Sequence, residues 1–486
     1  MPSASAPSHH SFLAKERDYR EQRRAYWNEY CSEYAQWEPG RRVYRDRLKA
    51  VYKFIVPPGS RVLELGCGPG DLLAALDPSF GVGVDLSEDF VAMARARHPQ
   101  LTFIAADCHQ LELNEEFDYI VLSDLANDLW DIQRTLERVG AHAHPGTRVV
   151  LNFYSNLWQP FRALAEFFRL AKPQPRQNWV TMEDVANLFH LADFEVIRAS
   201  REVLMPVYIP LLGSLLNRYV VKLWPFTHFA LSNVIVARPL GPPRLDLEPT
   251  VSIVVAARNE EGNVPEIFDR VPKIGAGTEL IFVEGNSTDD TYGAIEREML
   301  RHPGRDVKLF KQPGKGKGDA VRTGFANARG DVLMILDADL TVAPEDLPLF
   351  YDAWRSGRGE YINGVRLVYP MEEKAMRFFN LIGNKFFAMA FSWLLNQNIK
   401  DTLCGTKVLS RKHYESIAAN RAYFGDFDPF GDFDLIFGAA KQNLRFVDLP
   451  VRYRERRYGE TNIQRWRHGV ILLRMVFYAL RRIKFV

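Results

Sequence analysis

Short apolar runs alternate with amphipathic stretches along the chain, and this alternation occurs twice. In the first half, the runs that predict strands are Val62–Leu65, Gly81–Asp85, Leu101–Ala105, Phe117–Ser123, Arg148–Phe153, Phe194–Ala199 and Asn233–Ala237. In the second half they are Val251–Ala256, Leu280–Glu284, Val307–Lys311, Val332–Asp337 and Tyr361–Gly364. Strands that alternate with helices are typical of a parallel, doubly wound sheet. The pattern therefore predicts two α/β domains, with helices over residues 13–55 and long amphipathic helices beyond Glu372.

A proline-rich segment separates the two patterns. Residues Arg238–Pro249 contain four prolines and one glycine, a composition that marks a domain boundary. A length of 486 residues also suits more than one domain. We therefore expect an N-terminal domain over residues 1–238, a linker over 239–249, a second domain over 250–465 and a C-terminal tail over 466–486.

The bulk composition is that of an ordinary globular protein and excludes several classes. The hydrophobic fraction is 47% and the charged fraction is 25%, and the net charge of +2 argues neither for nor against a polyanionic partner overall. We expect no nucleic-acid partner. The four cysteines are scattered outside any Cys/His cluster, which fits a reducing compartment and argues against structural zinc. The polar N-terminus predicts no signal peptide, and no apolar run reaches the ~18 residues of a membrane span. We expect a cytoplasmic protein for which peripheral membrane contact stays open.

Glycines and acids follow the first strands of the N-terminal half. The segment Glu64–Gly70 leaves the first strand with three glycines, which let the backbone approach a ligand closely. The second strand ends at Asp85, where an acid is placed to bind the ribose hydroxyls of a nucleoside. The third strand is followed by Asp107, which suits an adenine amino group. Three acids at successive strand ends make the glycine pattern more specific than it is alone.

These residues resemble the signature of the class I S-adenosylmethionine-dependent methyltransferases. The resemblance covers about residues 40–238 and implies a Rossmann-like fold with a methyl donor bound by Glu64, Gly66, Gly68, Gly70, Asp85 and Asp107. A dinucleotide dehydrogenase is the rival interpretation, but its pattern usually places the third glycine one residue later. The methyl acceptor is left open. Asp124, after the fourth strand, lies where many methyltransferases place acceptor-facing residues, and helix capping is the alternative role.

Paired carboxylates mark the second half of the chain. Asp337 and Asp339 stand two residues apart at a strand end, so both can reach one cation. A hard cation such as Mg²⁺ or Mn²⁺ would bridge these oxygens to a diphosphate. Neighbouring strands deliver Arg258–Glu260 and Glu284, and the carboxyl ends of parallel strands share one edge of the sheet. The lysines and glycines of Lys315–Ala320 then open a helix and suit a pyrophosphate.

Together these segments resemble the family 2 glycosyltransferases of fold type A, especially the polyprenyl-phosphate sugar synthases. The resemblance covers about residues 250–465 and implies a nucleotide-sugar site built from Arg258, Asn259, Glu260, Glu284, Asp337 and Arg456. It also implies metal binding by Asp337 and Asp339. The sequence departs from the family at Glu284–Gly285, where paired aspartates are usual, and at Thr341, where glutamine is frequent.

Acceptor-side chemistry in this resemblance falls on two further segments. Asp432 lies where many relatives carry an acid-rich motif, so Asp432 and Asp339 are the catalytic candidates, with Asp432 as the base. Helix capping is the alternative role for Asp432. Arg456 belongs to the basic segment Arg452–Asn462, which relatives place near the donor and acceptor phosphates.

Two apolar segments raise the question of a membrane surface. Residues 441–486 hold 12 lysines and arginines against 3 acids, interleaved with apolar residues in a helical pattern from Trp466. This composition fits a helix in a membrane interface, or one packed against the second domain. The stretch Met205–Phe229, broken by prolines, is either a substrate-covering insertion or an interfacial segment.

The two halves together predict a bifunctional enzyme that uses S-adenosylmethionine and a divalent cation. A nucleotide-sugar donor, a polyprenyl-phosphate acceptor and a place at the inner face of the cytoplasmic membrane are the matching expectations. The fusion suggests one glycolipid or cell-envelope pathway. The alternative is a glycosyltransferase whose first domain only binds a ligand or scaffolds a partner, and the intact Glu64–Gly70 motif argues against it.

Overall fold

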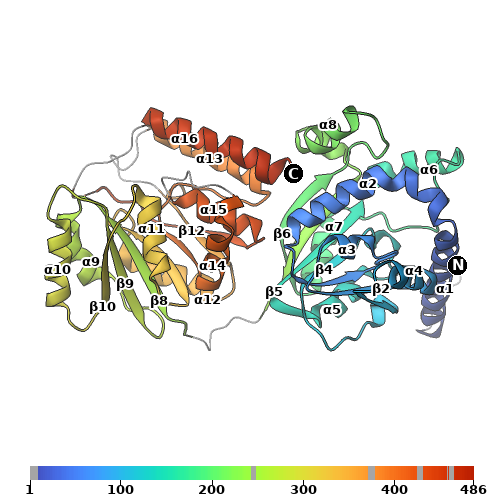
Figure 1. The fold of residues 1–486 in the computed structure, drawn as a ribbon, viewed down its shortest axis with the longest axis horizontal. Coiled ribbons are helices and arrows are strands. Elements are labelled where there is room, and N and C mark those ends of the chain that lie inside the picture. Colours follow the sequence, from blue (N-terminus) through green and yellow to red (C-terminus); the bar gives the residue numbers. More distant parts are fainter. Residues whose placement is uncertain (1–8, 242–247, 370–377, 424–430, 457, 459–464) are drawn as a thin grey trace, which may run out of the picture. The chain divides into compact units, whose positions relative to one another are not determined.

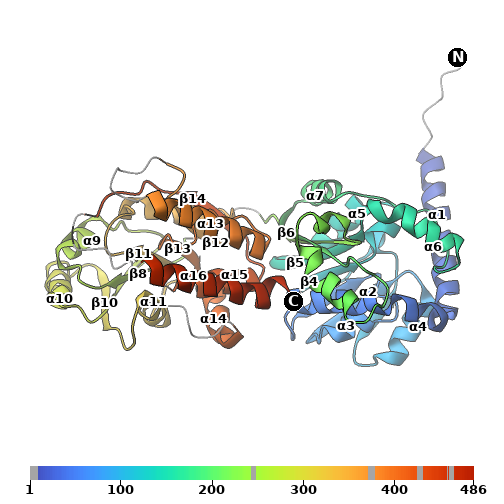
Figure 2. The same ribbon diagram turned by 90° about the horizontal axis from the view of Figure 1, so that it is seen from above.

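The computed structural model describes residues 9–241, 248–369, 378–423, 431–456, 458 and 465–486. The chain divides into an N-terminal unit, Met1–Leu240 with Phe485–Val486, and a C-terminal unit, Gly241–Lys484. Figures 1 and 2 show each unit as a sheet with helices on both faces. The predicted linker and the predicted basic segment after Arg452 lie partly outside the described residues. Within the described residues, no helix combines the length and apolar character needed to cross a membrane.

The sheet of the N-terminal unit has seven strands in the order β3-β2-β1-β4-β5-β7-β6. The strands are β1 Arg61–Leu65, β2 Phe80–Asp85, β3 Thr102–Ala105, β4 Phe117–Ser123, β5 Ala143–Tyr154, β6 Phe194–Glu202 and β7 Ser232–Pro239. The first five pair in parallel, whereas β7 runs antiparallel to both β5 and β6. The dinucleotide-binding order 3-2-1-4-5-6 lacks such an inserted strand, so the topology argues against the rival dehydrogenase interpretation.

Helices cover both faces of this sheet. They are α1 His9–Ser32, α2 Tyr34–Ile55, α3 Asp71–Ala75, α4 Glu88–Arg97, α5 Ile132–Gly140, α6 Gln159–Phe167, α7 Met182–Leu191 and α8 Leu212–Arg218. Residues of α2, α3 and α4 share an apolar cluster with one face of the strands. Residues of α5 and α7 share a second cluster with the opposite face. Burial of two apolar faces is what an open α/β sheet requires for stability.

The segment between β6 and β7 is structured and does not continue the strand–helix alternation. It contains α8 and two short 3-10 helices, η4 Val220–Lys222 and η5 Phe226–Phe229. Val203 and Val221 are fully buried, and Val203 joins the apolar cluster on the α2 face. Most other apolar side chains of this segment are exposed.

The sheet of the C-terminal unit also has seven strands, in the order β10-β9-β8-β11-β13-β12-β14. The strands are β8 Val251–Ala257, β9 Thr278–Glu284, β10 Asp306–Lys311, β11 Val332–Asp337, β12 Tyr361–Val365, β13 Lys407–Ser410 and β14 Phe446–Pro450. The pairs β8–β9, β9–β10, β8–β11 and β12–β14 are parallel, while β13 is antiparallel to both β11 and β12. Neither β13 nor β14 was predicted from the sequence, where helices alone were expected beyond Glu372.

The helices of the C-terminal unit are α9 Val264–Arg270, α10 Thr291–Arg301, α11 Lys317–Ala326, α12 Leu347–Arg355, α13 Phe378–Leu395, α14 Arg411–Ala419, α15 Asp432–Lys441 and α16 Arg465–Ala479. Apolar residues of α9, α10 and α12 form one cluster with the strands. α16 lies beside α13 and continues into a π-helical turn, η9 Leu480–Lys484.

Each sheet reverses its strand order once among its parallel strands. In the N-terminal unit the reversal lies between β1 and β4, and in the C-terminal unit it lies between β8 and β11. Loops that leave such a pair of strands turn to opposite faces and open a crevice at their carboxyl ends, which is where open α/β sheets bind ligands. The fold therefore directs attention to the residues after β1, β4, β8 and β11.

Candidate functional site

The glycine-rich loop after β1 is fixed against the end of β2. Gly66, Gly68 and Gly70 all have positive φ angles, of 72°, 50° and 75°, which glycine adopts without strain. The Gly68 amide donates to Asp85 Oδ2 at 2.8 Å, and the Ser87 amide donates to Asp85 Oδ1 at 2.9 Å. Burial raises the pKa of Asp85, while these amide bonds oppose the rise. Asp85 therefore holds the glycine-rich loop in place by accepting a hydrogen bond from its backbone.

A cavity of about 230 Å³ lies at the carboxyl ends of β1, β2 and β4. Five of the six residues predicted to bind the cofactor line it, namely Glu64, Gly66, Gly68, Asp85 and Asp107. Gly70 is not among the lining residues. A Cβ atom there would fall 2.7 Å from the Phe103 ring, so Gly70 is needed for close packing where α3 begins. The strand-end acids that the sequence analysis grouped are therefore brought together around one cavity.

Glu64 presents an unusual carboxyl group to this cavity. The side chain is 2% exposed, and its Oε2 atom has no hydrogen-bond partner within the described residues. Burial raises the pKa of Glu64 well above its ordinary value. An unpartnered buried oxygen costs free energy unless a ligand supplies a donor. The unpartnered Glu64 oxygen therefore fits a ligand that has N–H or O–H groups, as a nucleoside-type cofactor has.

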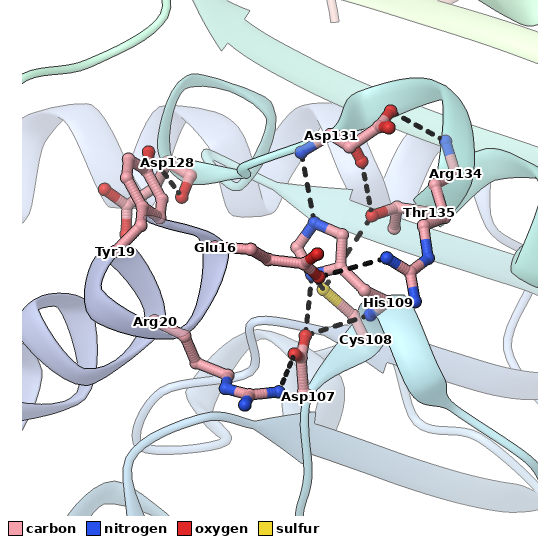
Figure 3. A network of polar contacts seen from close by, with 10 residues as sticks. All are labelled: Glu16, Tyr19, Arg20, Asp107, Cys108, His109, Asp128, Asp131, Arg134 and Thr135. Atoms are coloured by element: carbon pink, nitrogen blue, oxygen red, sulfur yellow. Dashed lines mark hydrogen bonds and ion pairs between the residues drawn. The ribbon is translucent and has the colours of Figure 1, made fainter. Parts of the chain in front are cut away.

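Asp107 is held by two side chains, one of which comes from the first helix. Its Oδ1 atom accepts hydrogen bonds from the backbone amide and the Nδ1 of His109, at 3.0 and 2.6 Å. Its Oδ2 atom accepts from Arg20 of α1 at 3.2 Å (Figure 3). Burial disfavours the anion, but the hydrogen bonds from His109 and Arg20 lower the pKa of Asp107 to about 2. Asp107 is therefore a carboxylate at neutral pH and anchors α1.

Asp107, Cys108 and His109 lie close enough for their ligand atoms to fall within 4.8 Å of one another. Both ring nitrogens of His109 already have hydrogen-bond partners, because Nε2 accepts from the backbone N–H of Asp131 at 3.2 Å and Nδ1 lies 2.6 Å from Asp107 Oδ1. The guanidinium of Arg20 also occupies the open side of Asp107. Figure 3 shows these groups as one hydrogen-bonded network, and the arrangement supports a structural role better than a metal site.

Helices α1 and α2 contribute a lining that the sequence analysis did not assign. Aromatic and basic side chains from these helices face the same cavity, namely Tyr19, Arg20, Arg23, Trp27, Tyr30, Tyr34, Arg41 and Arg45. Trp27 and Arg23 both bind the Asp128 carboxylate, at 2.6 and 2.8 Å. The richness of residues 13–55 in Arg, Tyr and Trp was the available signal, since such side chains bind both aromatic and anionic groups.

Asp124 lies in a buried polar network at the cavity. Its carboxylate accepts hydrogen bonds from Tyr44 at 2.6 Å and from Tyr154 at 3.2 Å, and Asn152 also donates to it. Arg41 in turn donates to the Tyr154 hydroxyl at 3.1 Å. Burial raises the pKa of Asp124, with opposition from the Arg41 charge and these hydrogen bonds. Asp124 has a positive φ of 55°. Its carboxylate binds Tyr44, Tyr154 and Asn152 and does not cap the short helix that follows, so the alternative capping role is not seen.

In the C-terminal unit, Asp337 is paired with a lysine that begins α11. Lys317 Nζ lies 2.5 Å from Asp337 Oδ1. Burial disfavours the charged form of Asp337, but the Lys317 charge outweighs this effect and lowers its pKa. Gly405 also lies against the carboxylate, since a Cβ atom there would fall 2.1 Å from Asp337 Oδ2. Lys317 and Gly405 therefore belong to the site. Lys317 lies in the segment Lys315–Ala320 that was expected to suit a pyrophosphate, whereas Gly405 was not among the predicted site residues.

Asp339 and Glu260 share one arginine. Arg456 donates to Asp339 Oδ2 at 2.7 Å and to Glu260 Oε1 at 3.2 Å. The other oxygen of Asp339 accepts from the amide and hydroxyl of Thr341, at 3.2 and 2.8 Å. Burial raises the pKa of Glu260 to about 7 against the opposing charge of Arg456. Three predicted residues from β8, β11 and the segment after β14 thus meet at one point.

The residues after β8 and β9 support the same edge of the sheet. Asn259 accepts from the Thr288 amide at 2.8 Å, and its own amide donates to Ser287 at 3.0 Å. Glu284 is buried and accepts from the Ser287 amide at 2.5 Å, so it shapes the turn after β9. Arg258 is exposed. A Cβ atom at Gly285 would lie 3.2 Å from that of Arg258, so a side chain at this position would be tightly packed.

Asp432 is the first residue of α15 and is 3% exposed. Its Oδ1 atom lies 3.4 Å from Lys407 Nζ and has no hydrogen-bond partner within the described residues. The preceding Gly431 packs on α11, because a Cβ atom there would fall 2.6 Å from the Gly318 Cα. Burial lowers the pKa of Lys317, but the negative charges of Asp337, Asp432 and Asp339 raise it by more, so the net pKa lies above its ordinary value. These acids thus form one electrostatic cluster around Lys317.

The donor set suits a divalent cation and a diphosphate. Asp337 and Asp339 offer carboxylate oxygens, the ligands preferred by Mg²⁺ and Mn²⁺. Each is paired with a cationic side chain, Lys317 or Arg456. A metal ion that bound these carboxylates would replace the lysine and the arginine as their positive partner. The displaced Lys317 and Arg456 would then be available to bind phosphate oxygens.

Comparisons with known proteins match each unit separately. Residues 19–199 match the family described as a methyltransferase domain, and residues 252–418 match glycosyl transferase family 2. A dolichol-phosphate mannosyltransferase from Pyrococcus furiosus is 29% identical over 219 residues, which cover 44% of this chain and 59% of that protein. An undecaprenyl-phosphate 4-deoxy-4-formamido-L-arabinose transferase from Shewanella sediminis is 32% identical over 102 residues, covering 20% and 31%.

The chain spans only part of these curated relatives, 59% of the first one. Among solved structures, the methyltransferase in the Haloferax volcanii complex with the Trm112 activator aligns with 17% identity and a TM-score of 0.35, over 44% of this chain and 98% of that one. The chain therefore carries two enzyme domains, a methyltransferase domain in its N-terminal unit and a glycosyl transferase family 2 domain in its C-terminal unit.

Proposed function

We propose that the N-terminal unit transfers a methyl group from S-adenosylmethionine to an acceptor that enters the cavity beyond β1. The observation that carries this proposal is the convergence of Glu64, Gly68 and Asp85 on one cavity. S-adenosylmethionine supplies a methyl group on a sulfonium, so the chain needs mainly to position the two substrates.

The residues of this cavity suit separate tasks. Asp85 and the glycine loop are positioned for the ribose, and the unpartnered oxygen of Glu64 can accept a further donor from the cofactor. Asp124 faces the same cavity with a pKa raised by burial, which suits a group that accepts a proton from the methyl acceptor. The methyl acceptor would then lie near Tyr44 and Tyr154.

Isothermal titration with S-adenosylmethionine tests this proposal. We expect binding by the unsubstituted chain and a loss of roughly tenfold or more in affinity for Asp85→Ala, because hydrogen bonds to charged groups contribute about 1.5–3 kcal/mol. Asp89→Ala, at an exposed position on α4, is the matched control and should bind normally. If the unsubstituted chain shows no binding, the domain is better interpreted as a scaffold.

For the C-terminal unit we propose an inverting, metal-dependent transfer of a sugar from a nucleotide-sugar, with a polyprenyl phosphate as acceptor. The observation that carries it is the convergence of Asp337, Asp339 and Asp432 on one edge of the sheet. Asp337 and Asp339 would hold Mg²⁺ or Mn²⁺, which neutralises the diphosphate leaving group. The relatives named for dolichol phosphate and undecaprenyl phosphate support the choice of acceptor class.

Several side chains of this unit have chemistry that fits the transfer. Arg456 and Lys317 provide cations for the donor phosphates, while Arg258 and Glu284 border the position of the nucleotide base. Asp432 would deprotonate or orient the acceptor, and a phosphate acceptor that is already an anion needs little help from a base. In-line attack on the opposite side from the leaving group inverts the anomeric centre.

A lipid acceptor requires contact with a membrane surface, and α13 and α16 support one. Exposed apolar side chains stand on both helices, including Phe386, Met389, Leu473 and Phe477. Basic residues follow in η9, where Arg481 and Arg482 are exposed and Lys484 is buried. Helices with apolar and basic residues lie in membrane interfaces. We therefore propose peripheral contact at the inner face of the cytoplasmic membrane.

The test is a screen of UDP-, GDP- and dTDP-sugars against polyprenyl phosphate, with isolated membranes and Mn²⁺ or Mg²⁺ present. Asp339→Ala should abolish transfer, whereas Asp352→Ala, at an exposed position on α12, should retain it. Loss of transfer with a chelator and the anomeric configuration of the product test the metal and the inversion. Full activity of Asp339→Ala would refute the assigned metal site.

A further inference from the structure

The N-terminal unit carries an exposed apolar surface that the two catalytic proposals do not use. Two segments form it, Leu157–Leu170 around α6 and Val207–Phe229 around α8, η4 and η5, and we call them together the outer apolar patch. Its most exposed members include Leu211 at 91%, Trp224 at 80%, Phe167 at 80% and Tyr208 at 78%. Contiguous apolar surface of this kind marks a site of interaction.

The two segments are joined, so the patch is one surface. Trp158 Nε1, at the start of α6, donates to the carbonyl of Phe229 in η5 at 2.9 Å. The Ser155 amide likewise donates to the Leu231 carbonyl at 2.8 Å. In Figure 1, α6 and α8 both lie near the upper edge of this unit.

Buried polar side chains beneath the patch fix the backbone of the segment that carries it. The Asn217 side chain accepts from the amides of Leu204 and Met205, at 2.8 and 2.7 Å, and donates to the Met205 carbonyl. Lys222 is buried and pairs with Glu202 of β6, which also binds Arg47 at 2.9 Å. Polar groups are thus turned inward and satisfied, while leucine and tryptophan are turned to solvent. This is the reverse of the usual pattern, in which large apolar residues are inside.

The charged residues around the patch indicate the chemistry of its partner. Residues 203–231 contain no Asp or Glu, and residues 155–182 contain only Glu166. These two ranges, which enclose the segments of the patch, hold six lysines and arginines. Arg169, Arg176 and Arg218 are exposed, so their charges are available at the surface. An anionic lipid surface combines negative charge with an apolar interior, and Trp and Tyr concentrate at its interface.

We propose that the outer apolar patch binds an anionic membrane surface and docks the N-terminal unit on it. Leu211, Trp224 and Tyr208 enter the interface, and Arg169, Arg176 and Arg218 bind lipid phosphates. This goes beyond the proposed membrane contact of α13 and α16 and does not depend on either transferase activity. The chain thereby has a separate lipid-binding surface in each unit.

A polarity-sensitive fluorophore placed on the full chain tests the proposal. The native cysteines are buried or partly buried, so Leu211→Cys offers a site that labels preferentially, with the unsubstituted chain as the labelling background. Leu211 is nearly fully exposed, so its replacement leaves the core intact. Leu191→Cys on α7 is the matched control, because that helix packs on the opposite face of the sheet.

With vesicles of phosphatidylcholine and phosphatidylglycerol, the probe at residue 211 should shift to the blue and brighten, and the probe at 191 should not. Charge reversal at Arg169, Arg176 and Arg218 should remove the shift. An unchanged probe at 211 on a chain that co-sediments with vesicles would overturn the proposal, while leaving the contact of α13 and α16 intact. Equal shifts at both positions, an equal shift with pure phosphatidylcholine, or a shift that grows with protein concentration without vesicles would overturn it too.

Discussion

Arg20 of α1 donates to Asp107 Oδ2 at 3.2 Å and thereby joins the first helix to the residue that follows β3. The two residues are 87 positions apart in the chain. The same helix adds Glu16, paired with Arg134 at 3.0 Å, and Tyr19, which donates to the Asp128 carbonyl (Figure 3). The cavity at the carboxyl end of β1 is thus lined by a helix whose attachment depends on Asp107, one of the acids predicted to bind a cofactor.

The first prediction concerns this attachment. Asp107→Asn removes the charge that binds Arg20 and His109, so hydrogen exchange in α1 should become faster at pH 7. Because the pKa of Asp107 falls from 3.8 to about 2 on folding, the carboxylate contributes about 2 kcal/mol of stability. That contribution is complete above about pH 4 and is lost as the pH falls toward 2. The part of the difference between variant and unsubstituted chain that comes from this titration should therefore shrink as the pH falls from about 4 toward 2.

Glu112→Gln is a suitable control, since Glu112 is exposed and pairs only loosely with Arg138, at 3.9 Å. It should leave exchange in α1 unchanged. Normal protection of α1 in Asp107→Asn would mean that Glu16 and Tyr19 hold the helix alone.

A second prediction links Lys317 to metal binding. In Lys317→Met, the carboxylate of Asp337 loses its cationic partner, and a partly buried unpaired charge should lower the stability of the C-terminal unit by about 2 kcal/mol. Mn²⁺ should then restore the melting temperature, because binding to the folded state alone stabilises it. Thermal melting with and without Mn²⁺ measures both effects.

Lys315→Met provides the comparison, because Lys315 is exposed and precedes the helix by two residues. It should change neither the melting temperature nor its response to Mn²⁺. A Lys317→Met chain that Mn²⁺ fails to stabilise would argue against metal binding by Asp337.

Much of the fold follows from local sequence. Apolar strands such as Val62–Leu65 and Val251–Ala256 appear as β1 and β8 within a residue or two, because a strand buried on both faces is apolar throughout. The β13 strand was missed since it has four residues and begins with Lys407, which is 0% exposed. That lysine is buried only because Asn363 and the nearby Cys404 carbonyl accept its hydrogen bonds and Asp432 lies close to it, and Asn363 and Asp432 come from distant segments.

The candidate sites divide in the same way. Acids at strand ends, such as Asp85 and Asp337, could be predicted because parallel strands bring their carboxyl ends to one edge. Arg20 and Gly405 could not, because each reaches its site through packing between segments far apart in the chain. Gly70 was assigned to the ligand from its motif, whereas its position beside Phe103 shows a packing requirement that the motif does not reveal.

A third prediction uses the raised pKa of Glu260. Burial moves this pKa from 4.5 to about 7, so the folded state keeps a proton that the unfolded state releases near pH 4.5. The stability of the C-terminal unit should therefore decrease as the pH rises from about 4.5 to 7. Glu260→Gln carries no such proton, and its melting temperature should fall less between pH 5 and 8. Glu296→Gln, at an exposed position on α10, should keep the pH profile of the unsubstituted chain.

The last prediction separates the geometry of the metal site from the stability of the fold. In Gly405→Ala, the new Cβ atom would lie 2.1 Å from Asp337 Oδ2 and 2.3 Å from Lys317 Nζ, both far closer than atoms can approach. Both atoms end flexible side chains, so the fold can yield by moving them at little cost, and the melting temperature should change by only a few degrees. The Asp337 carboxylate would be displaced from its position beside Lys317, so sugar transfer should fall by roughly a hundredfold, as expected when an ~1 Å misplacement disrupts a site.

Gly304→Ala is the matched substitution, because no atom lies within 4 Å of its new Cβ. Transfer assays and melting curves for the two variants should diverge only in activity. Since Asp337 is also the proposed metal ligand, Gly405→Ala should need a higher Mn²⁺ concentration for half-maximal rate than Gly304→Ala. If Gly405→Ala kept full activity at the same Mn²⁺ concentration, Asp337 would not bind the metal in the conformation described.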